Sequence, residues 1–401
     1  MQESSSVERR KLAVHPLSRW FWAVLLVCVI ALVLGMLYLP AHARAAVATP
    51  GKPSSISATP GNQQVALSWG AASGATGYLI NETDLVTGTT TQLSTTVTTT
   101  SFTVTGLLVG HWYRFSVVPV DDTGQGPSSD PIEVRTTGFS GSYQHYYALG
   151  DSYSAGEGAP PYTGPTGCYQ STNGYPYLLG SGVPAPVLLA CSGARTTDID
   201  GTSGQLSKVP KNPQGNTLIT ITIGGNDMGF SDEVEKCILS FSSCTHDDST
   251  LTQQIEAFQP RLLQLYQEIR AVAPGADIII VGYPLLFADP SIADCHNPIV
   301  YWGLSGAEMQ MIRNLATLLD NTIAAAASQA GVFSVTQQVE QAFAGHEACT
   351  ANESQEWINE IAGTNDALHD SFHPNSAGYH AYATAIDSAR NLLYQKGMVR
   401  S

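Results

Sequence analysis

The sequence predicts an α/β protein in three layers, with helices on both faces of a parallel sheet and a smaller all-β sandwich before it. Two observations predict this fold class. Residues 50–138 contain short runs of β-branched and aromatic residues broken by turns, whereas strand-like runs alternate with helical periodicity from residue 143 onward. Strands separated only by turns favour a sandwich, and alternating strands and helices favour a parallel sheet. A further apolar segment precedes both parts.

Residues 1–45 have the order of an export signal. Basic residues precede an apolar run from Trp20 to Leu39, and Pro40 and a small-residue stretch follow it. This is the order of a secretory signal peptide, and we expect cleavage after Ala45. The apolar run is about 20 residues long, so the alternative is an uncleaved membrane anchor over residues 20–39. Under either interpretation, the chain after residue 46 is extracellular.

The composition indicates a globular protein and argues against nucleic-acid binding. Hydrophobic residues make up 43% of the chain and charged residues only 13%, which is too apolar for intrinsic disorder. The formal net charge is −15, and no basic run extends beyond Arg9-Arg10-Lys11. A chain this acidic is poorly suited to phosphate backbones, so we expect no nucleic-acid partner.

The cysteines predict disulfides. Cys28 lies in the apolar N-terminal run, and the other six all lie after residue 160. An even number of cysteines in an exported chain indicates three disulfides, although six cysteines allow 15 pairings. We expect neighbours in the sequence to pair, as Cys168–Cys191, Cys237–Cys244 and Cys295–Cys349. A zinc site is the alternative, but the chain has no C-x-x-C motif, and we expect no metal.

Residues 50–138 form the first predicted domain. The strands are expected at Gln64–Trp69, Gly77–Ile80, Phe102–Val104, His111–Val120 and Ile132–Val134. Trp69 would fill the core, and Tyr113 lies where a tyrosine hydroxyl can bond back to the chain at a strand corner. The stretch resembles a fibronectin type III domain. A disordered Thr-rich stalk over residues 89–105 is the alternative, but its embedded apolar residues favour a strand.

Residues 143–397 form the second predicted domain. Strands are expected at Tyr146–Leu149, Leu218–Ile223 and Asp277–Val281, and amphipathic helices around residues 255–269, 312–323 and 379–393. In parallel sheets of this kind, ligands bind beyond the carboxyl ends of the strands. The functional residues are therefore sought at those ends.

Four short motifs lie at strand ends or in loops. They are Gly150-Asp151-Ser152, the small-residue loop around Gly193, Gly224-Gly225-Asn226-Asp227, and Asp370-x-x-His373 before the last helix. A serine after a strand can present its hydroxyl at the sheet edge, and an imidazole can take its proton. A carboxylate three residues before a histidine can fix the tautomer of the imidazole. Each motif alone is ambiguous, because Gly-Asp-Ser turns and Asx turns are common.

Together and in this order, the motifs resemble the SGNH (GDSL) hydrolase superfamily, over residues 143–397. The segments GDSYSAGEG, GGND, GYP, GHEAC and HPNSAGY are most similar to secreted actinobacterial-type esterases and lipases. The resemblance implies a flavodoxin-like parallel sheet and no cofactor. It further implies that Ser152 is the nucleophile, that His373 is the base and that Asp370 orients it. The backbone N–H groups of Ser152 and Gly193, with the Asn226 side chain, would form the oxyanion hole.

Several other polar residues have weaker claims to a role. Asp151 and Asp227 are expected to fix turns. His369 is the weaker competitor of His373, because only His373 both has a carboxylate three residues earlier and is followed by Pro-Asn. The cluster His246-Asp247-Asp248 resembles a metal site only superficially, and we expect a solvated loop. Residues expected to line the entrance to the site are Glu157, Tyr162 and Tyr169.

The predicted function is an exported carboxylic-ester hydrolase that works through a serine acyl-enzyme. The resemblance implies lipid esters as substrates. A polysaccharide acetyl-esterase is the enzymatic alternative, and the non-enzymatic one is an inert surface-binding protein that uses the type III domain. In the enzyme, that domain would be a spacer or would contact polysaccharide or another surface weakly. We expect a monomer.

Overall fold

The computed structural model describes residues 24–28, 30, 49–93, 95–138, 142–230, 237, 248–296, 300, 303–361 and 368–400. Residues 1–48 and 49–401 form two separate units. In the first unit, residues 24–28 are helical and exposed. The rest of the expected export segment, including the cleavage site after Ala45, lies outside the described residues. Among the residues that are described, no helix is long and apolar enough to cross a bilayer.

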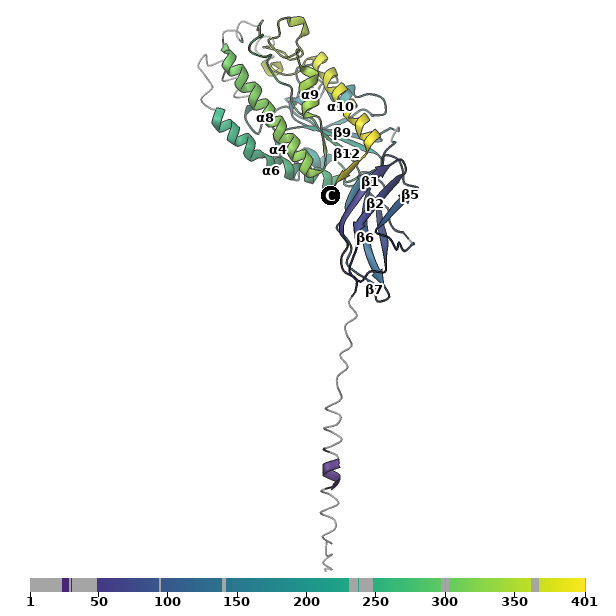
Figure 1. Ribbon diagram of the computed structural model, residues 1–401. Helices are drawn as coiled ribbons and strands as arrows, with labels where there is room; N and C mark the ends of the chain where they lie inside the picture. Colours follow the sequence, from purple (N-terminus) through teal and green to yellow (C-terminus); the bar gives the residue numbers. More distant parts are fainter. Residues whose placement is uncertain are drawn as a thin grey trace, which may run out of the picture. The chain divides into compact units, whose positions relative to one another are not determined.

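The N-terminal part of the second unit is the expected antiparallel sandwich (Figure 1). One sheet has the strand order β1-β2-β5, and the other has the order β14-β8-β6-β3-β4, with β7 paired to β6. The strands are β1 (Ser54–Gly61), β2 (Gln64–Gly70), β3 (Gly77–Asp84), β4 (Thr90–Gln92), β5 (Ser101–Thr105), β6 (Trp112–Asp121), β7 (Gly124–Gln125), β8 (Ile132–Arg135) and β14 (Met398–Arg400).

The sandwich core follows from the alternation of the sequence. In β2, exposed and buried residues alternate, and Trp69 is buried and packs edge-on against Tyr78 with ring centroids 5.4 Å apart. The Leu108 backbone N–H donates to the Tyr113 hydroxyl at 2.9 Å, which is the predicted tyrosine corner. Strand β5 occupies part of the Thr-rich segment, so the structure places a strand there and not a stalk.

The last strand of the sandwich comes from the far end of the chain. β14 pairs antiparallel with β8, so the C-terminus completes the N-terminal domain's sheet. The periodicity of the sequence predicts the second domain only as far as residue 397 and does not reveal this strand. A run of only three residues carries too little periodicity to reveal a strand.

The remainder of the second unit is the expected parallel sheet with helices on both faces. All neighbours in its strand order, β10-β9-β11-β12-β13, pair in parallel. The strands are β9 (His145–Gly150), β10 (Val187–Leu188), β11 (Thr217–Thr222), β12 (Asp277–Ile280) and β13 (Phe333–Ser334). Every residue of β11 is buried, as expected for a strand covered on both faces.

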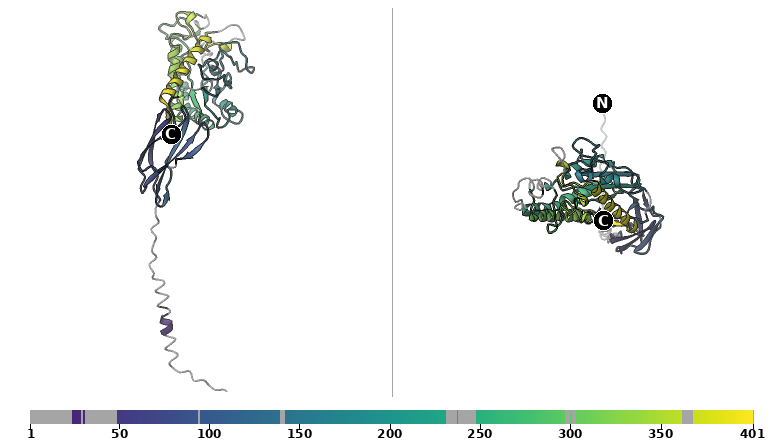
Figure 2. Two further views of the ribbon diagram at one scale, coloured as in Figure 1. Left: turned by 90° about the vertical axis from the view of Figure 1, so that its right-hand side faces the viewer. Right: turned by 90° about the horizontal axis from the view of Figure 1, so that it is seen from above.

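Long helices flank this sheet. The helices and 3-10 turns are α2 (Ser152–Ala155), α3 (Tyr175–Leu178), α4 (Thr196–Ile199), η1 (Gln205–Lys208), α6 (Asp248–Val272), α8 (Gly306–Ala330), α9 (Thr336–Phe343), η3 (Glu353–Gln355), η4 (Leu368–Asp370) and α10 (Ser376–Lys396). α6 packs against α8, and α10 packs against α9 (Figures 1 and 2). α10 also packs against α3. The three long helices predicted from the periodicity of the sequence are α6, α8 and α10.

The five cysteines of this domain that the structure describes form disulfides. Cys168 is bonded to Cys191, and Cys295 is bonded to Cys349, as two of the three expected pairs. Cys237 is also disulfide-bonded, but Cys244 lies outside the described residues, so their pairing stays a prediction. Sulfur atoms joined in a disulfide are not thiolates, so these five cysteines are not zinc ligands.

Candidate active site

Ser152 lies two residues after the end of β9, a strand that pairs with the central strand β11. Asp151 caps the one-turn helix α2 by accepting the Tyr153 N–H at 3.0 Å, and Ser152 is the first residue of that helix. The strand can end this close to β11 only because residue 150 is a glycine with φ 124°. A Cβ atom there would lie 2.2 Å from the Thr222 carbonyl oxygen. The turn therefore presents the serine hydroxyl at the edge of the sheet, as predicted.

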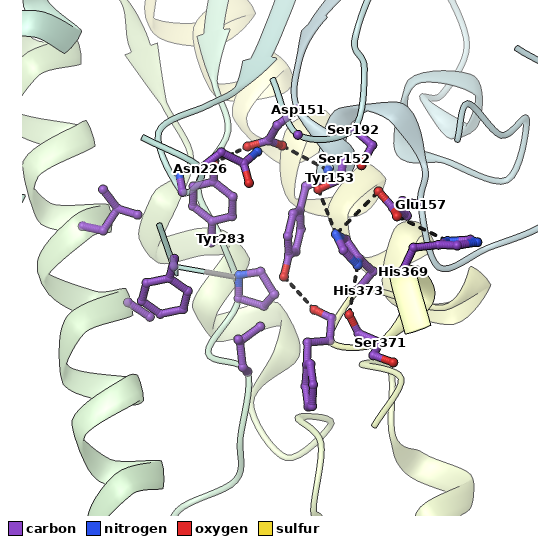
Figure 3. A pocket seen from close by; sticks show the side chains of 18 of the residues that line it. Asp151, Ser152, Tyr153, Glu157, Ser192, Asn226, Tyr283, His369, Ser371 and His373 are labelled. Atoms are coloured by element: carbon purple, nitrogen blue, oxygen red, sulfur yellow. Dashed lines mark hydrogen bonds and ion pairs between the residues drawn. The ribbon is translucent and has the colours of Figure 1, made fainter. Parts of the chain in front are cut away.

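His373 reaches Ser152 from the loop before α10. Its Nε2 lies 2.8 Å from Ser152 Oγ, and its Nδ1 lies 3.0 Å from the Ser371 carbonyl oxygen (Figure 3). A carbonyl oxygen only accepts hydrogen bonds, so Nδ1 carries the proton and Nε2 is left as the acceptor for the serine hydroxyl. Tyr153 supports this loop, because its hydroxyl donates to the Phe372 carbonyl at 2.7 Å.

The position of Asp370 differs from the expected one. Its carboxylate accepts the Tyr162 hydroxyl and lies 2.7 Å from Nδ1 of His369, while His373 is held by a backbone carbonyl. The expectation assumed that residues 370 and 373 share one helical turn. Instead, the 3-10 turn η4 ends at Asp370, and Phe372 has φ 60°, so the chain reverses and turns the Ser371 carbonyl toward the imidazole.

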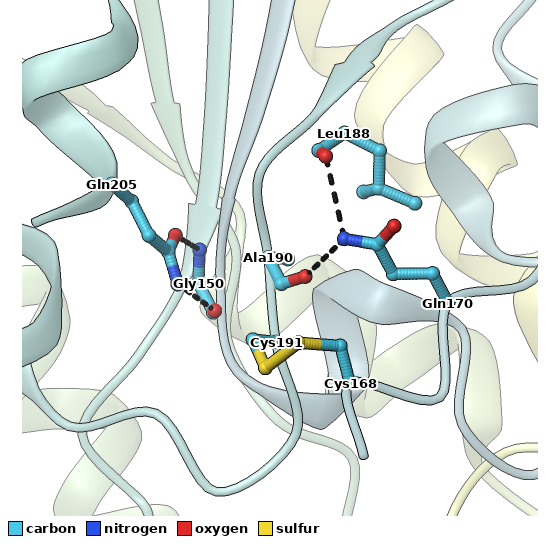
Figure 4. Close-up of a disulfide and its surroundings, with 7 residues drawn as sticks. All are labelled: Gly150, Cys168, Gln170, Leu188, Ala190, Cys191 and Gln205. Atoms are coloured by element: carbon cyan, nitrogen blue, oxygen red, sulfur yellow. Dashed lines mark hydrogen bonds between the residues drawn. A yellow bond between two sulfur atoms is a disulfide. The ribbon is translucent and has the colours of Figure 1, made fainter. Parts of the chain in front are cut away.

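The loop around Gly193 is fixed from both ends. The Cys168–Cys191 disulfide anchors it, and the Gln170 side-chain amide donates to the carbonyls of Leu188, at 3.3 Å, and Ala190, at 2.7 Å (Figure 4). Gly193 itself has φ 75°, a conformation that glycine adopts without strain. These contacts hold the backbone of the loop beside Ser152.

Asn226 connects the Gly193 loop to the end of β11. Its side-chain amide donates to the Ala194 carbonyl at 3.0 Å, and the Gly225 N–H donates to the Tyr283 hydroxyl at 3.0 Å. The next residue, Asp227, was expected to fix its own turn, but it accepts hydrogen bonds from the backbone and hydroxyl of the distant Thr196, at the start of α4. The structure thus brings the Ser152, Gly193 and Asn226 motifs to one site.

These residues line a cavity of about 370 Å³. Ser152, Gly193, Asn226 and His373 contribute polar groups to its lining. Its apolar lining consists of Phe230, Pro284, Leu286, Ala316, Leu319, Ile361 and Phe372. A cavity with this division can hold an apolar group while a polar group faces the serine.

Burial shifts the pKa values of the site. It lowers the pKa of His373 to about 4, so the imidazole is neutral and able to accept a proton at neutral pH. Burial also raises the pKa of Asp151 to about 7, although the Tyr283 hydroxyl, which donates to this carboxylate at 2.5 Å, opposes the shift. The pKa of Glu157 rises to about 8, again mainly because of burial.

The remaining predicted residues gather beside the cavity. The ring of His369 stacks on Tyr169 with centroids 3.8 Å apart, and Tyr162 packs edge-on against both rings. His373, and not its competitor His369, is therefore the histidine that contacts Ser152. Glu157 lines the cavity directly, closer to the serine than the expected entrance position. The cluster at residues 246–248 cannot be compared, because residues 246 and 247 lie outside the described part.

Two contributions to the site have little or no signal in the residue types of the sequence. The Ser371 carbonyl carries no signal, because every residue has one. The Tyr283 hydroxyl, which links Asp151 to Gly225, lies in the GYP segment that was noted only as a likeness. Its position could have been sought at the carboxyl end of β12, where parallel-sheet sites gather.

Comparisons with known proteins agree with this geometry. The family model described as GDSL-like Lipase/Acylhydrolase matches residues 148–381, and the model of the fibronectin type III domain matches residues 51–135. The chain is 34% identical over 238 residues to Lipase 1 of Streptomyces coelicolor, covering 58% of this chain and 81% of that protein. It is 32% identical over 250 residues to a lipase of Streptomyces rimosus, covering 61% and 86%.

Solved structures give the same result. The crystal structure of the extracellular lipase from Streptomyces rimosus matches with 31% identity and a TM-score of 0.53, covering 61% of this chain and 99% of that one. The crystal structure of phospholipase A1 from Streptomyces albidoflavus matches with 30% identity and a TM-score of 0.53, covering 62% and 100%.

Proposed function

The chain belongs to the GDSL-like lipase/acylhydrolase family and is a carboxylic ester hydrolase, and from that premise we propose an exported enzyme that cleaves lipid esters through an acyl-enzyme on Ser152. The observation that carries the proposal is the 2.8 Å contact between Ser152 Oγ and Nε2 of His373. A serine hydroxyl is a weak nucleophile until a neighbouring imidazole takes its proton. The short contact and the neutral imidazole supply that condition.

In the first half-reaction, Ser152 Oγ attacks the ester carbonyl while its proton moves to Nε2 of His373. The oxyanion that forms is stabilised by the backbone N–H groups of Ser152 and Gly193 and by the Asn226 amide, each worth about 3–4 kcal/mol of barrier. The imidazolium then gives its proton to the leaving alcohol. Water, activated by the same imidazole, releases the acid in the second half-reaction.

In this mechanism, the Ser371 carbonyl replaces the side-chain acid that Asp370 was expected to provide. By accepting the Nδ1 proton at 3.0 Å, it fixes the tautomer in which Nε2 faces the serine. A neutral carbonyl fixes the tautomer as a carboxylate does, but it lacks the negative charge that stabilises an imidazolium.

Lipid esters are favoured over acetyl esters by the cavity. Its apolar lining gives an acyl chain much to contact, whereas an acetyl group would leave most of a cavity of about 370 Å³ unfilled. The names of the relatives, lipase and phospholipase A1, agree with this choice. The acetyl-esterase alternative predicts instead that activity is highest for the shortest acyl chain.

Export is supported by two observations. The Cys168–Cys191 and Cys295–Cys349 disulfides are of a kind that persists in oxidising compartments. The segment over residues 1–45 has the order of a signal peptide, and one structural relative is described as extracellular. The protein would therefore act outside the cell.

A series of p-nitrophenyl esters, from acetyl to long acyl, tests the proposal on residues 46–401. We expect an optimum at a medium or long chain, and Ser152→Ala should reduce hydrolysis by at least about 10⁴-fold. Ser388→Ala, at an exposed serine of α10, is the matched control and should keep full activity. Unchanged activity of folded Ser152→Ala would exclude the serine mechanism. An optimum at acetyl would favour the acetyl-esterase.

A further inference from the structure

Glu157 is a buried acid that the mechanism above does not use. It follows α2 at the sheet edge, and its side chain is 2% exposed. Its Oε2 lies 3.9 Å from Nε2 of His373, and its Oε1 lies 3.3 Å from Nδ1 of His369 (Figure 3). Within the described part of the chain, Oε2 makes no hydrogen bond. A buried carboxylate oxygen without a partner is costly, so a functional reason for it is worth seeking.

The proposed reaction places a positive charge on His373, and Asp370, whose charge raises the pKa of that imidazole, is not in direct contact with it. When His373 takes the serine proton, a buried imidazolium forms, and burial disfavours that charge. Its Nδ1 donates to the carbonyl of Ser371, and the ring also has a hydrogen bond to the backbone of His369; both partners are neutral. Among the described residues, the carboxylate of Glu157 is the only one within 4 Å of a His373 ring nitrogen.

We propose that Glu157 is a positioning residue whose carboxylate supplies the counter-charge to the His373 imidazolium, the part expected of Asp370. This inference rests on the proposed function of Ser152. The chemical step stays the same: the Oγ–carbon bond forms, the carbonyl π electrons move to oxygen, and the proton passes from Oγ to Nε2. Glu157 gains no bond. It lies close enough to stabilise the new positive charge electrostatically.

Asp370 and His369 complete the arrangement. Nδ1 of His369 lies between the two carboxylates, 3.3 Å from Glu157 and 2.7 Å from Asp370, and Tyr162 donates to the far side of Asp370. Nδ1 of His369 is thus within ion-pair distance of both carboxylates, although it makes no hydrogen bond within the described residues. Asp370 contacts the reacting groups only through His369 and Glu157, but its charge also raises the pKa of His373 against the effect of burial.

The charge of Glu157 is adjustable because no permanent cation neutralises it. No Lys or Arg in the described ranges lies within 4 Å of its oxygens. The titratable groups around it are His369, His373, Asp151, Asp370, Tyr153, Tyr162 and Tyr379. Burial, with the nearby carboxylates, raises the pKa of Glu157 to about 8, against the hydrogen bond from Ser192. Its negative charge therefore develops as the pH rises through about 8.

The isosteric variant Glu157→Gln tests the proposal in the purified enzyme. We expect wild-type kcat to rise as the pH increases through about 8, and this rise to be absent in Glu157→Gln. At pH 9, kcat of the variant should be about 10- to 100-fold lower with KM within about twofold, and at pH 6 the difference should nearly vanish. Glu353→Gln, at an exposed acid, is the matched control and should keep the wild-type profile.

Thermal stability separates this role from a structural one. A carboxyl group whose pKa is raised in the folded protein costs stability as the pH rises from its unfolded value, near 4, through its folded value. The melting temperature of Glu157→Gln should therefore be higher than that of the wild type at pH 9 and equal to it at pH 5. A variant that melts lower at both pH values, with the alkaline rise intact, would show a structural residue and overturn the proposal.

Two further outcomes would also overturn it. An alkaline rise that a chelator abolishes would mean that a cation held by Glu157, His369 and Asp370 acts there instead of a free carboxylate. A Glu157→Gln variant with wild-type kcat at every pH would mean that Glu157 has no part in the reaction. Failure of the proposed function is distinguishable, because Ser152 would then not react with a fluorophosphonate probe even in the wild type.

Discussion

Two buried carboxylates, Asp277 and Glu157, have opposite surroundings. Asp277, at the start of β12, accepts four hydrogen bonds from three residues: two from Arg135, at 2.7 and 2.8 Å, one from the Trp112 indole at 3.0 Å and one from the Tyr143 hydroxyl at 2.7 Å. Glu157 has only histidines within ion-pair distance, and one of its oxygens makes no hydrogen bond within the described residues. Asp277 is permanently paired with a cation, whereas Glu157 has no permanent cationic partner among the described residues.

The difference reflects what each carboxylate is near. Arg135 is fully buried, and Asp277 outweighs the effect of burial and raises the pKa of that guanidinium. A permanently charged pair of this kind needs every hydrogen bond satisfied to tolerate its burial. Near Ser152 the positive charge, on the His373 imidazolium, exists only during the reaction. A carboxylate that stabilises this charge therefore has no cationic partner in the resting enzyme. The unpaired carboxylate oxygen at the site and the fully paired carboxylate elsewhere both follow from the free-energy cost of burying a charge.

The paired cluster joins the two domains. Arg135 and Trp112 belong to the sandwich, and Asp277 and Tyr143 belong to the parallel-sheet domain. Arg400, from β14, adds a 2.6 Å bond to Glu133 and lies over the Trp112 ring at 3.7 Å. The sandwich is therefore attached by buried polar contacts and by a shared sheet, and not only by a linker. Its removal would leave Asp277 without its cation.

The largest effect is expected when the imidazole that carries the transient positive charge is removed. His373→Ala takes away the group that accepts the serine proton, so kcat/KM for a p-nitrophenyl ester should fall by about 10⁴-fold or more. The melting temperature should change little by comparison. Steady-state hydrolysis with a thermal melt on the same sample checks both. More than one per cent residual activity would mean that another base reaches Ser152.

A smaller effect, on stability, is expected when the permanent pair is broken. Asp277→Ala leaves Arg135 buried without its partner, and the free energy of unfolding should drop by about 3–5 kcal/mol. The folded fraction should keep its kcat, because the site residues are untouched. Denaturant titration measures the loss. Asp130→Ala removes an exposed pair with Lys52 and should cost at most about 1 kcal/mol. Equal costs for the two variants would contradict the comparison.

The smallest effect is expected at Asp370. Since the Ser371 carbonyl fixes the tautomer of His373, Asp370→Asn should lower kcat by less than about 10-fold, far less than the roughly 10⁴-fold loss typical when a triad acid is removed. The loss should occur mainly at alkaline pH, where Glu157 is ionised. Parallel pH profiles of this variant and Glu157→Gln provide the check. A loss comparable to that of His373→Ala would restore Asp370 as the direct partner of the base.

The sequence by itself determined the fold class and which strand ends meet. Period-two alternation predicted the sandwich, and helical periodicity predicted α6, α8 and α10. The order of Ser152, Gly193, Asn226 and His373 was sufficient to name the family. These features depend on local patterns, or on residue types at strand ends that topology necessarily brings together.

Only the tertiary structure decided how the charges are distributed. Phe372 reverses the chain, so a backbone carbonyl and not Asp370 meets His373. The pairing of Asp277 with Arg135 spans 142 positions of sequence, and β14 joins a strand from the opposite end of the second unit. Hydrogen bonds to backbone atoms leave no trace in residue types, and long-range pairs depend on packing. The sequence alone therefore could not show that Asp277 is paired with a cation and that Glu157 is not.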